Sequence, residues 1–238
     1  MRTALITGGS RGIGAQTVRT FAAAGYRTAF FYRSSEEAAR ALADETGACA
    51  IGCDVSDSAS VKAACSEAQR VLSHIDVLVN NAGIAQQKLF TDITDEDWQR
   101  MLGVNLSGAF YVSREVLPGM ISRRHGRIVN VGSIWGQVGA SCEVHYSAAK
   151  AGLIGLTKAL AKEVAPSGVT VNCVCPGVIE TDMLSSFSKE DLGALTEETP
   201  VGRLGTPEDV AAMILWLCDE KAGFVTGQVI GVNGGFGE

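Results

Sequence analysis

Short apolar segments alternate with segments of helical periodicity along the whole chain, and this alternation restricts the folds open to it. Strand-like runs are predicted at 4–6, 28–32, 50–53, 77–79, 128–131, 169–174 and 229–232. Helix-like segments lie between them, at 13–24, 36–46, 60–72, 95–122, 146–165 and 207–217. Strands that are apolar throughout are typical of a parallel sheet covered on both faces. We therefore predict an α/β, doubly wound fold with a seven-stranded parallel sheet and helices on both faces.

Length and charge fit one domain without a nucleic-acid or membrane partner. The 238 residues are 46% hydrophobic and carry a formal net charge of −6. One α/β domain of this size is ordinary, so we expect a single domain over residues 1–238. A nucleic-acid binder would normally show a basic face. No apolar stretch has the length of a membrane span, and the N-terminus lacks the features of a signal peptide, so we expect a cytoplasmic protein.

The cysteines do not suggest a metal site. The chain has seven cysteines and three histidines, and the histidines are scattered. Cys173 and Cys175 face the same way on a predicted strand, but two thiols do not make a closed ligand set. We predict reduced, buried thiols and no metal.

A glycine-rich turn, residues 7–14, follows the first predicted strand and opens the first helix. It reads Thr-Gly-Gly-Ser-Arg-Gly-Ile-Gly. Glycines allow a tight turn and let backbone N–H groups approach a pyrophosphate, which a helix N-terminus also favours. In this context the turn predicts a dinucleotide site. The residues assigned to it are Gly8, Ser10, Arg11, Gly12, Ile13 and Gly14.

Tyr146 and Lys150 are four residues apart, which places them on one face of a predicted helix. A free tyrosine has a pKa of about 10, so at neutral pH it is a poor proton shuttle. A neighbouring cation favours the phenolate, and the pair therefore suits a tyrosine that gives or takes a proton. The same spacing also fits a solvated helix face.

These motifs and their order resemble the short-chain dehydrogenase/reductase family. The glycine turn has that family's spacing, Thr-Gly-x-x-x-Gly-x-Gly. Later landmarks are Asn80-Asn81-Ala82-Gly83, Asn105, Ser133, Tyr146 with Lys150, and Pro176-Gly177 with Thr181. The resemblance covers the full length and implies a single-domain Rossmann-type fold. It also implies four catalytic residues, namely Asn105, Ser133, Tyr146 and Lys150.

The resemblance implies a division of labour among these four. Tyr146 is the acid for reduction and the base for oxidation, and Ser133 donates a hydrogen bond to the substrate oxygen. Lys150 binds the nicotinamide ribose and lowers the tyrosine pKa, while Asn105 holds a water through which Lys150 relays protons. Simpler readings exist, namely a helix N-cap for Ser133 and a satisfied core amide for Asn105. His145 adjoins Tyr146 but is expected on a different helix face.

The second strand predicts NADP(H) as the cofactor. It ends in Arg33 and Ser34 with no acid before Glu36, and Arg11 supplies a second cation. An acid at this place suits NAD, whereas a basic residue accommodates the 2′-phosphate of NADP. The resemblance also implies that Asp54 and Val55 contact the adenine ring of the cofactor. It also implies cofactor contacts from Asn81, Ala82, Gly83, Tyr146, Lys150, Pro176, Gly177, Ile179 and Thr181.

Within the family, the sequence closely resembles bacterial 3-oxoacyl-[acyl-carrier-protein] reductases. The shared stretches are 125–128, 148–155, 176–183 and 232–235. This likeness implies reduction of a 3-oxoacyl thioester on an acidic carrier protein in fatty acid synthesis. Arg123, Arg124 and Arg127 could form a basic patch for the carrier. Ser167 stands where many of those reductases hold a further arginine.

Two alternatives stay open. The stretch 133–144 is similar to a Gram-positive subgroup that includes the reductase of a 5-aminopentanone modification on elongation factor P. Glu143 could then be the partner of an amine, or simply a solvent-exposed acid. Some relatives bind NADP as non-catalytic regulators, but these usually lack the tyrosine or the lysine.

The segment at about 177–206 is expected to be a substrate lid. Because members of the family are usually tetramers, the resemblance also implies a homotetramer built on the long helices.

Overall fold

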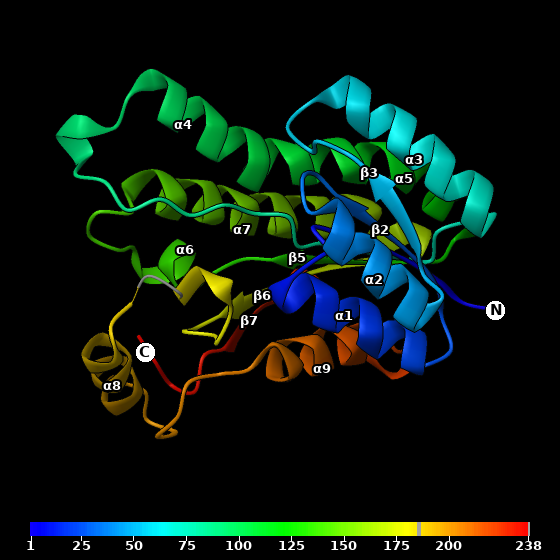
Figure 1. The fold of residues 1–238 in the computed structure, drawn as a ribbon. Coiled ribbons are helices and arrows are strands. Elements are labelled where there is room, and N and C mark those ends of the chain that lie inside the picture. The colour runs from blue at the N-terminus through cyan, green and yellow to red at the C-terminus, as the bar shows by residue number, and fades with distance from the viewer. Residues whose placement is uncertain (185–186, 238) are drawn as a thin grey trace.

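One parallel sheet forms the centre of the molecule (Figure 1). The computed structural model describes residues 1–184 and 187–237. The strand order is β3-β2-β1-β4-β5-β6-β7 in a seven-stranded sheet, and each neighbouring pair is parallel. The predicted doubly wound fold is therefore confirmed. The strands are β1 (Thr3–Thr7), β2 (Arg27–Tyr32), β3 (Cys49–Gly52), β4 (Val77–Asn80), β5 (Gly126–Val131), β6 (Val169–Pro176) and β7 (Val229–Val232).

Helices cover both faces of this sheet (Figure 1). One apolar core lies under α1, α2 and α9, and the other lies under α3, α5 and α7. Successive residues of β1 alternate between the two cores, since Leu5 packs in one while Ala4 and Ile6 pack in the other. The helices are α1 (Gly12–Ala23), α2 (Glu36–Thr46), α3 (Ser58–Leu72), α4 (Asp95–Leu102), α5 (Gly108–Arg123), α6 (Trp135–Val138), α7 (Val144–Val164), α8 (Lys189–Glu198) and α9 (Pro207–Leu217).

Side-chain caps set the start of three helices. Thr94, Ser188 and Thr206 each accept a hydrogen bond from the backbone three residues on, and an aspartate at that position bonds back. Such reciprocal capping satisfies amides that the first helical turn leaves unpaired. The cap at Thr206 is followed by a proline at the first helical position of α9, where a missing N–H costs nothing.

The structure departs from the predicted elements in three ways. The helix expected over 95–122 is divided by a π-helical turn, Gly103–Ser107, between α4 and α5. Helices α6 and α8 were not predicted, because both lie in stretches without a clear apolar period. Short 3₁₀ turns occur at Phe90–Asp92, Ala165–Ser167, Asp182–Leu184 and Glu220–Ala222.

The strand order reverses direction between β1 and β4. From β1 the chain proceeds to β2 and β3 on one side, whereas β4 to β7 lie on the other. Ligands of open α/β sheets bind at the carboxyl ends of the strands where this reversal occurs. The candidate residues that follow β1, β4, β5 and β6 therefore meet at one edge. Separately, no helix in the described residues is long and apolar enough to span a membrane.

Candidate functional site

The glycine turn after β1 is fastened to the end of β4. The Thr7 hydroxyl accepts hydrogen bonds from the backbone N–H groups of Asn81 and Ala82, both at 3.0 Å. The Asn81 side-chain amide donates to the carbonyl oxygens of Thr7 and Gly8, also at 3.0 Å. Gly8 has a φ of 65°, and a Cβ there would lie 2.8 Å from the Ala82 Cα. Only glycine therefore fits this close approach.

The N-terminus of α1 can receive an anion. Its N-cap residue, Arg11, is extended and provides no side-chain cap. Uncapped N–H groups and the helix dipole favour negative charge at this end. A hollow of about 460 Å³ opens here, with Ser10, Arg11, Gly12 and Thr181 in its lining. The site therefore fits the pyrophosphate of a dinucleotide.

Two exposed arginines lie near this end of the sheet, in the glycine turn and after β2. Arg33 Nη1 is 3.9 Å from Asp54 Oδ2, and both side chains are about half exposed. Asp54 also accepts hydrogen bonds from the Ser56 backbone and hydroxyl, which hold the pKa of the carboxyl below its usual value. Val55 is buried and packs against Gly108. Arg11 and Arg33 thus leave positive charge available to a phosphate.

Lys150 is buried at the carboxyl end of β5. Only 4% of the residue is exposed, and its Nζ donates to the Val131 carbonyl oxygen at 2.8 Å. The same Nζ lies 5.6 Å from the centroid of the Tyr146 ring. Burial lowers the pKa of Lys150 to about 8, while the Cys173 and Cys175 thiols act in the opposite sense. A lysine in this range can exchange a proton near neutral pH.

Ser133 lies close enough to Tyr146 to act on the pKa of the phenol. Burial raises the pKa of Tyr146 to about 12, and the Ser133 side chain acts in the opposite direction. Lys150 is expected to lower this pKa, and that effect stays a prediction. Burial of the phenol is the largest cause of the shift in the structure, and it acts in the opposite direction. At neutral pH the phenol is protonated.

Ser133 also forms a hydrogen bond with the backbone that follows it. It follows β5 and is buried, and its hydroxyl accepts from the Trp135 N–H at 3.2 Å. This is close to the helix-cap role considered from the sequence, because α6 begins at Trp135. The two roles coexist, since a hydroxyl has one donor and two acceptor positions.

Asn105 lies within the π-helical turn, and its side chain is fully engaged. Its amide donates to the carbonyl oxygens of Ile84 at 3.0 Å and Met101 at 3.1 Å, and its Oδ1 accepts from the Ile84 N–H at 3.3 Å. Gly83 separates this side chain from Lys150. A Cβ on Gly83 would lie 2.8 Å from Asn105 Oδ1 and 3.5 Å from Lys150 Nζ. The water expected at Asn105 stays a prediction.

The segment after β6 reaches the same edge. Pro176 accepts a backbone hydrogen bond from Ile134 at 3.0 Å, and Gly177 donates to Val232 at 3.0 Å. The Thr181 methyl group lies 3.4 Å from the position of a Cβ on Gly12. Ile179 is buried and packs with the core under α1 and α9. The predicted 176–181 stretch is thus next to the glycine turn.

The three arginines considered for carrier docking lie elsewhere in the subunit. Arg123, Arg124 and Arg127 are at the amino end of β5, whereas Ser133 follows its carboxyl end. The strand separates them by roughly 16 Å. Arg127 is buried, and Arg123 and Arg124 donate to the backbone oxygens of Ile75 and Pro166. The trio does not border the Ser133–Tyr146 pair of its own subunit.

Sequence reasoning missed two contacts that fix Lys150. The first is its acceptor, the Val131 carbonyl, which depends on the packing of α7 against the sheet. The second is Gly136, where a Cβ would lie 2.8 to 3.0 Å from the backbone and Cβ of Lys150 and the Ala151 nitrogen. The glycine in the Trp-Gly pair after Ser133 was the available signal. It marks a close approach between α6 and α7.

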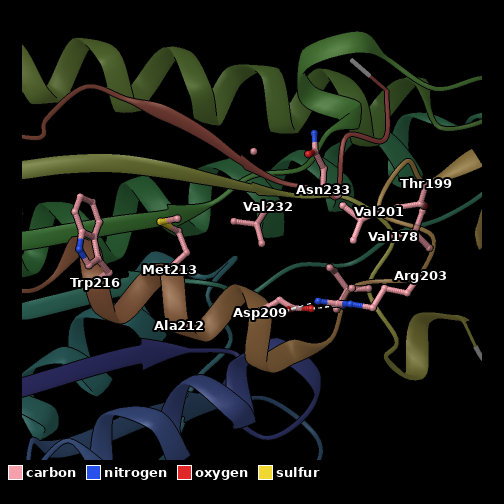
Figure 2. A pocket seen from close by; sticks show the side chains of 14 residues that line it. Val178, Thr199, Val201, Arg203, Asp209, Ala212, Met213, Trp216, Val232 and Asn233 are labelled. Carbon is pink, nitrogen blue, oxygen red and sulfur yellow. Dashed lines mark hydrogen bonds and ion pairs between the residues drawn. The ribbon is translucent and has the colours of Figure 1, made fainter.

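A second hollow of about 490 Å³ lies between α9, the end of β7 and the 199–205 segment (Figure 2). Met213, Trp216, Val201 and Val232 give it an apolar lining. Figure 2 also shows the Arg203–Asp209 ion pair, with a distance of 2.6 Å, at one end. Neither Ser133 nor Tyr146 lines this hollow.

The cysteines and acids do not assemble a metal centre in the described part of the chain. No group of three or more histidine, cysteine, aspartate or glutamate side chains lies close enough to hold an ion there. Cys173 and Cys175 have their sulfur atoms 3.8 Å apart and are both buried.

Comparison with known proteins identifies the family of the chain. A family model described as enoyl-(acyl carrier protein) reductase matches residues 8–237. The chain belongs to the short-chain dehydrogenase/reductase family. It is therefore an NAD(P)-dependent oxidoreductase that acts on ketone or hydroxyl groups.

Three relatives span almost the whole chain. An acetoacetyl-CoA reductase of Rhizobium meliloti is 45% identical, with 98% of each chain covered. The 3-oxoacyl-[acyl-carrier-protein] reductase FabG of Aquifex aeolicus is also 45% identical, and that of Escherichia coli is 40% identical. Each of these two matches covers 98% of this chain and 96% of the relative.

Proposed function

We propose that this chain is an NADPH-dependent reductase of 3-oxoacyl thioesters, acting on 3-oxoacyl-[acyl-carrier-protein] in fatty acid synthesis. The observation that carries the proposal is the meeting of Ser133, Tyr146 and Lys150 beside the glycine turn at one sheet edge. Relatives named for 3-oxoacyl-carrier and acetoacetyl-CoA substrates support a ketoacyl thioester. A cytoplasmic location remains a prediction.

NADP(H) is the proposed cofactor, and the reduced nicotinamide supplies a hydride to the carbonyl carbon when it is bound. Arg11 and Arg33 are exposed cations at the places where a 2′-phosphate needs partners. The turn residues Gly8 to Gly14 with Asn81, Ala82 and Gly83 would hold the pyrophosphate and ribose. The further proposed contacts are Ser34, Asp54, Val55, Tyr146, Lys150, Pro176, Gly177, Ile179 and Thr181.

Tyr146 is proposed to give its proton to the ketone oxygen. The phenol is protonated at neutral pH, which is the form required for reduction. Ser133 would donate a second hydrogen bond to the oxygen as negative charge develops there. Lys150, with a pKa near 8, can return a proton to the site, and its Nζ lies across Gly83 from Asn105. Asn105 would support this return path.

A second substrate is favoured by Glu143. This carboxyl group is partly buried, lies near Gln87, which acts to lower its pKa, and is close enough to Tyr146 to raise the pKa of the phenol. It is therefore not the fully solvated acid considered from the sequence. A partly buried carboxylate near Tyr146 suits a substrate that carries an amine, such as the 5-aminopentanone modification of elongation factor P. An acyl chain gives this carboxylate no partner.

A substrate panel with NADPH separates the candidates. Acetoacetyl-carrier protein, acetoacetyl-CoA and aminopentanone-modified elongation factor P are compared by kcat/KM, read from the loss of reduced nicotinamide absorbance. We expect the acetoacetyl thioesters to be reduced most efficiently. A preference for the modified elongation factor, lost in Glu143→Gln but unchanged for the thioesters, would establish the second candidate instead. Absence of turnover with every ketone would contradict both.

The quaternary state is proposed from the same family likeness. Several large apolar side chains are exposed on the single subunit, on α5, on α9 and after α9. They are Phe110, Trp216 and Phe224. Exposed apolar groups of this size are typical of a surface that is buried in an assembly. We propose a homotetramer, in which α5, α7 and the α9–β7 face meet neighbouring subunits.

A further inference from the structure

His145, the residue before Tyr146, is completely buried although nothing in the proposed reaction uses it. It lies at the start of α7, and its Nε2 is 2.9 Å from Gln86 Oε1. Gln86 belongs to residues 84–88, which we call the connecting segment. This segment leaves the end of β4, next to Gly83, and leads towards α4.

The hydrogen bonds around Gln86 determine the tautomer of His145. Gln86 Nε2 donates to Asp97 Oδ1 at 3.0 Å, so its Oε1 is the atom that faces the imidazole. That oxygen can only accept, and therefore His145 Nε2 carries the proton. His145 Nδ1 is buried and has no hydrogen-bond partner in the described residues. An unprotonated Nδ1 can be buried at this position, whereas a protonated Nδ1 would have no acceptor for its N–H.

Charged groups on two other elements hold this arrangement. Asp97 on α4 and Lys88 on the connecting segment are the charges that act on His145, in opposite senses. They are themselves paired, with 2.6 Å between Lys88 Nζ and Asp97 Oδ2. Burial lowers the pKa of His145, so the imidazole is neutral at physiological pH.

The connecting segment bridges the two halves of the candidate site. On one side, Ile84 forms two hydrogen bonds with Asn105 in the π-helical turn. On the other, the Lys88 N–H donates to the Cys142 carbonyl at 2.7 Å, just before α7. His145 adds a contact from α7 itself, one residue from Tyr146. The segment therefore holds Gly83 and Asn105 in register with Tyr146 and Lys150.

We propose that His145 is a positioning residue, whose neutral imidazole holds the connecting segment through Gln86 and thereby keeps Gly83 and Asn105 aligned with Lys150. It does not touch the reacting atoms. The expected effect on the reaction rate rests on the proposed reductase function. If Gly83 and Asn105 lose their alignment with Lys150, proton transfer should slow while the cofactor site remains. The structural consequence, an ordered connecting segment, does not depend on any activity.

Two substitutions at His145 distinguish a hydrogen-bonding role of this side chain from a role in packing alone. His145→Leu removes the N–H donor and leaves the Gln86 oxygen unpaired, and we expect kcat with acetoacetyl-CoA to fall about tenfold. The KM for NADPH should change less than about twofold. His145→Gln can place an amide N–H where Nε2 was, and we expect it to keep kcat within about twofold of the wild type. Gln99→Leu, at an exposed position of α4, is the matched control and should leave the rate unchanged.

Hydrogen exchange and NMR test the proposal without reference to turnover. The amides of Ile84 and Lys88 should exchange faster in His145→Leu and stay protected in His145→Gln. Long-range ¹H–¹⁵N spectra should show a proton on His145 Nε2 and none on Nδ1 at neutral pH. Gln86→Leu breaks the same bond from the less buried side, so it should give the same loss of kcat and protection if His145→Leu does not fold.

The proposal is overturned by any of three results. These are unchanged protection of the connecting segment in His145→Leu and Gln86→Leu, an equal loss of kcat in His145→Leu and His145→Gln, or a proton on Nδ1 in place of Nε2. If the wild type reduces no ketone, the proposed function fails, while the exchange and tautomer measurements still decide whether His145 holds the segment.

Discussion

The Lys150 ammonium lies 5.6 Å from the centroid of the Tyr146 ring, and its hydrogen bond goes to the Val131 carbonyl oxygen at 2.8 Å. The two side chains therefore share a face of α7 while each has its own principal partner. Tyr146 lies next to Ser133, and Lys150 is hydrogen-bonded to β5. Burial moves the two pKa values in opposite directions, up for the phenol and down for the ammonium. The pair thus combines a protonated phenol with a lysine that titrates near neutrality.

The lowered pKa of Lys150 makes a prediction about stability and pH. The folded value is about 8, below the unfolded value of about 10.4. Between these values the unfolded chain binds more protons, so this group favours the folded state increasingly as pH rises from about 8 to 10.4. Lys150→Met lacks the effect. The free energy of unfolding of the wild type, measured in urea, should therefore rise relative to Lys150→Met across this window, by on the order of 1–3 kcal/mol. A constant difference would mean that Lys150 is not buried in this way.

Gly83 is expected to tolerate no side chain, because it fits between Asn105 and Lys150. A Cβ there would lie 2.8 Å from Asn105 Oδ1, so Gly83→Ala should lower the free energy of unfolding by about 1–3 kcal/mol and reduce kcat. Gly193 in α8 is the matched control, since among the described residues no atom outside its own stretch of helix lies within 4 Å of its Cβ position. Gly193→Ala should leave stability unchanged or raise it by up to about 1 kcal/mol. Equal behaviour of the two variants would contradict the close packing at Gly83.

Arg33 should select the phosphorylated cofactor. If its guanidinium binds the 2′-phosphate, Arg33→Ala should weaken NADPH binding about tenfold or more and change NADH binding little. Arg40→Ala is the control, because Arg40 is exposed on α2 and pairs with Glu36. Cofactor titrations followed by nicotinamide fluorescence give both affinities. Equal weakening of NADPH and NADH in Arg33→Ala would remove the argument for NADP.

Gly155 tests the proposed assembly. It is exposed on α7, and within the described part of the subunit no atom beyond its own helical turns lies within 4 Å of its Cβ position. Gly155→Leu should therefore leave the subunit folded but separate it from a neighbour that packs on α7. Light scattering after gel filtration should give about four times the 24.9 kDa subunit mass for the wild type and less for the variant. A tetramer that survives the substitution would place the interface elsewhere.

The sequence predicted the parts of the fold that depend on local pattern. The bounds of α2 and α9 are as predicted, and the Thr206 cap with Pro207 explains the start of α9. Helix α8 had a readable signal, because Ser188 and Asp191 have capping-box spacing. We did not use it, since the surrounding stretch shows no clear apolar period.

The remaining features depend on contacts between distant segments. The π-helical turn at Asn105 accompanies hydrogen bonds to Ile84, 21 residues earlier, which helical periodicity does not encode. The acceptor of Lys150 depends on how α7 packs against β5. His145 was expected on a different face from Tyr146, but its burial and its bond to Gln86 required the path of the connecting segment. Pairwise spacing within one helix carries none of this information.

Tyr146→Phe tests the central claim most directly, because it removes the proton donor and keeps the ring. With NADPH and acetoacetyl-CoA, kcat should fall by at least about 10²-fold, the size typical of a lost general acid. NADPH affinity should stay within about threefold of the wild type. A Tyr146→Phe enzyme that consumes reduced nicotinamide at close to the wild-type rate would contradict the assignment of Tyr146 as the proton donor.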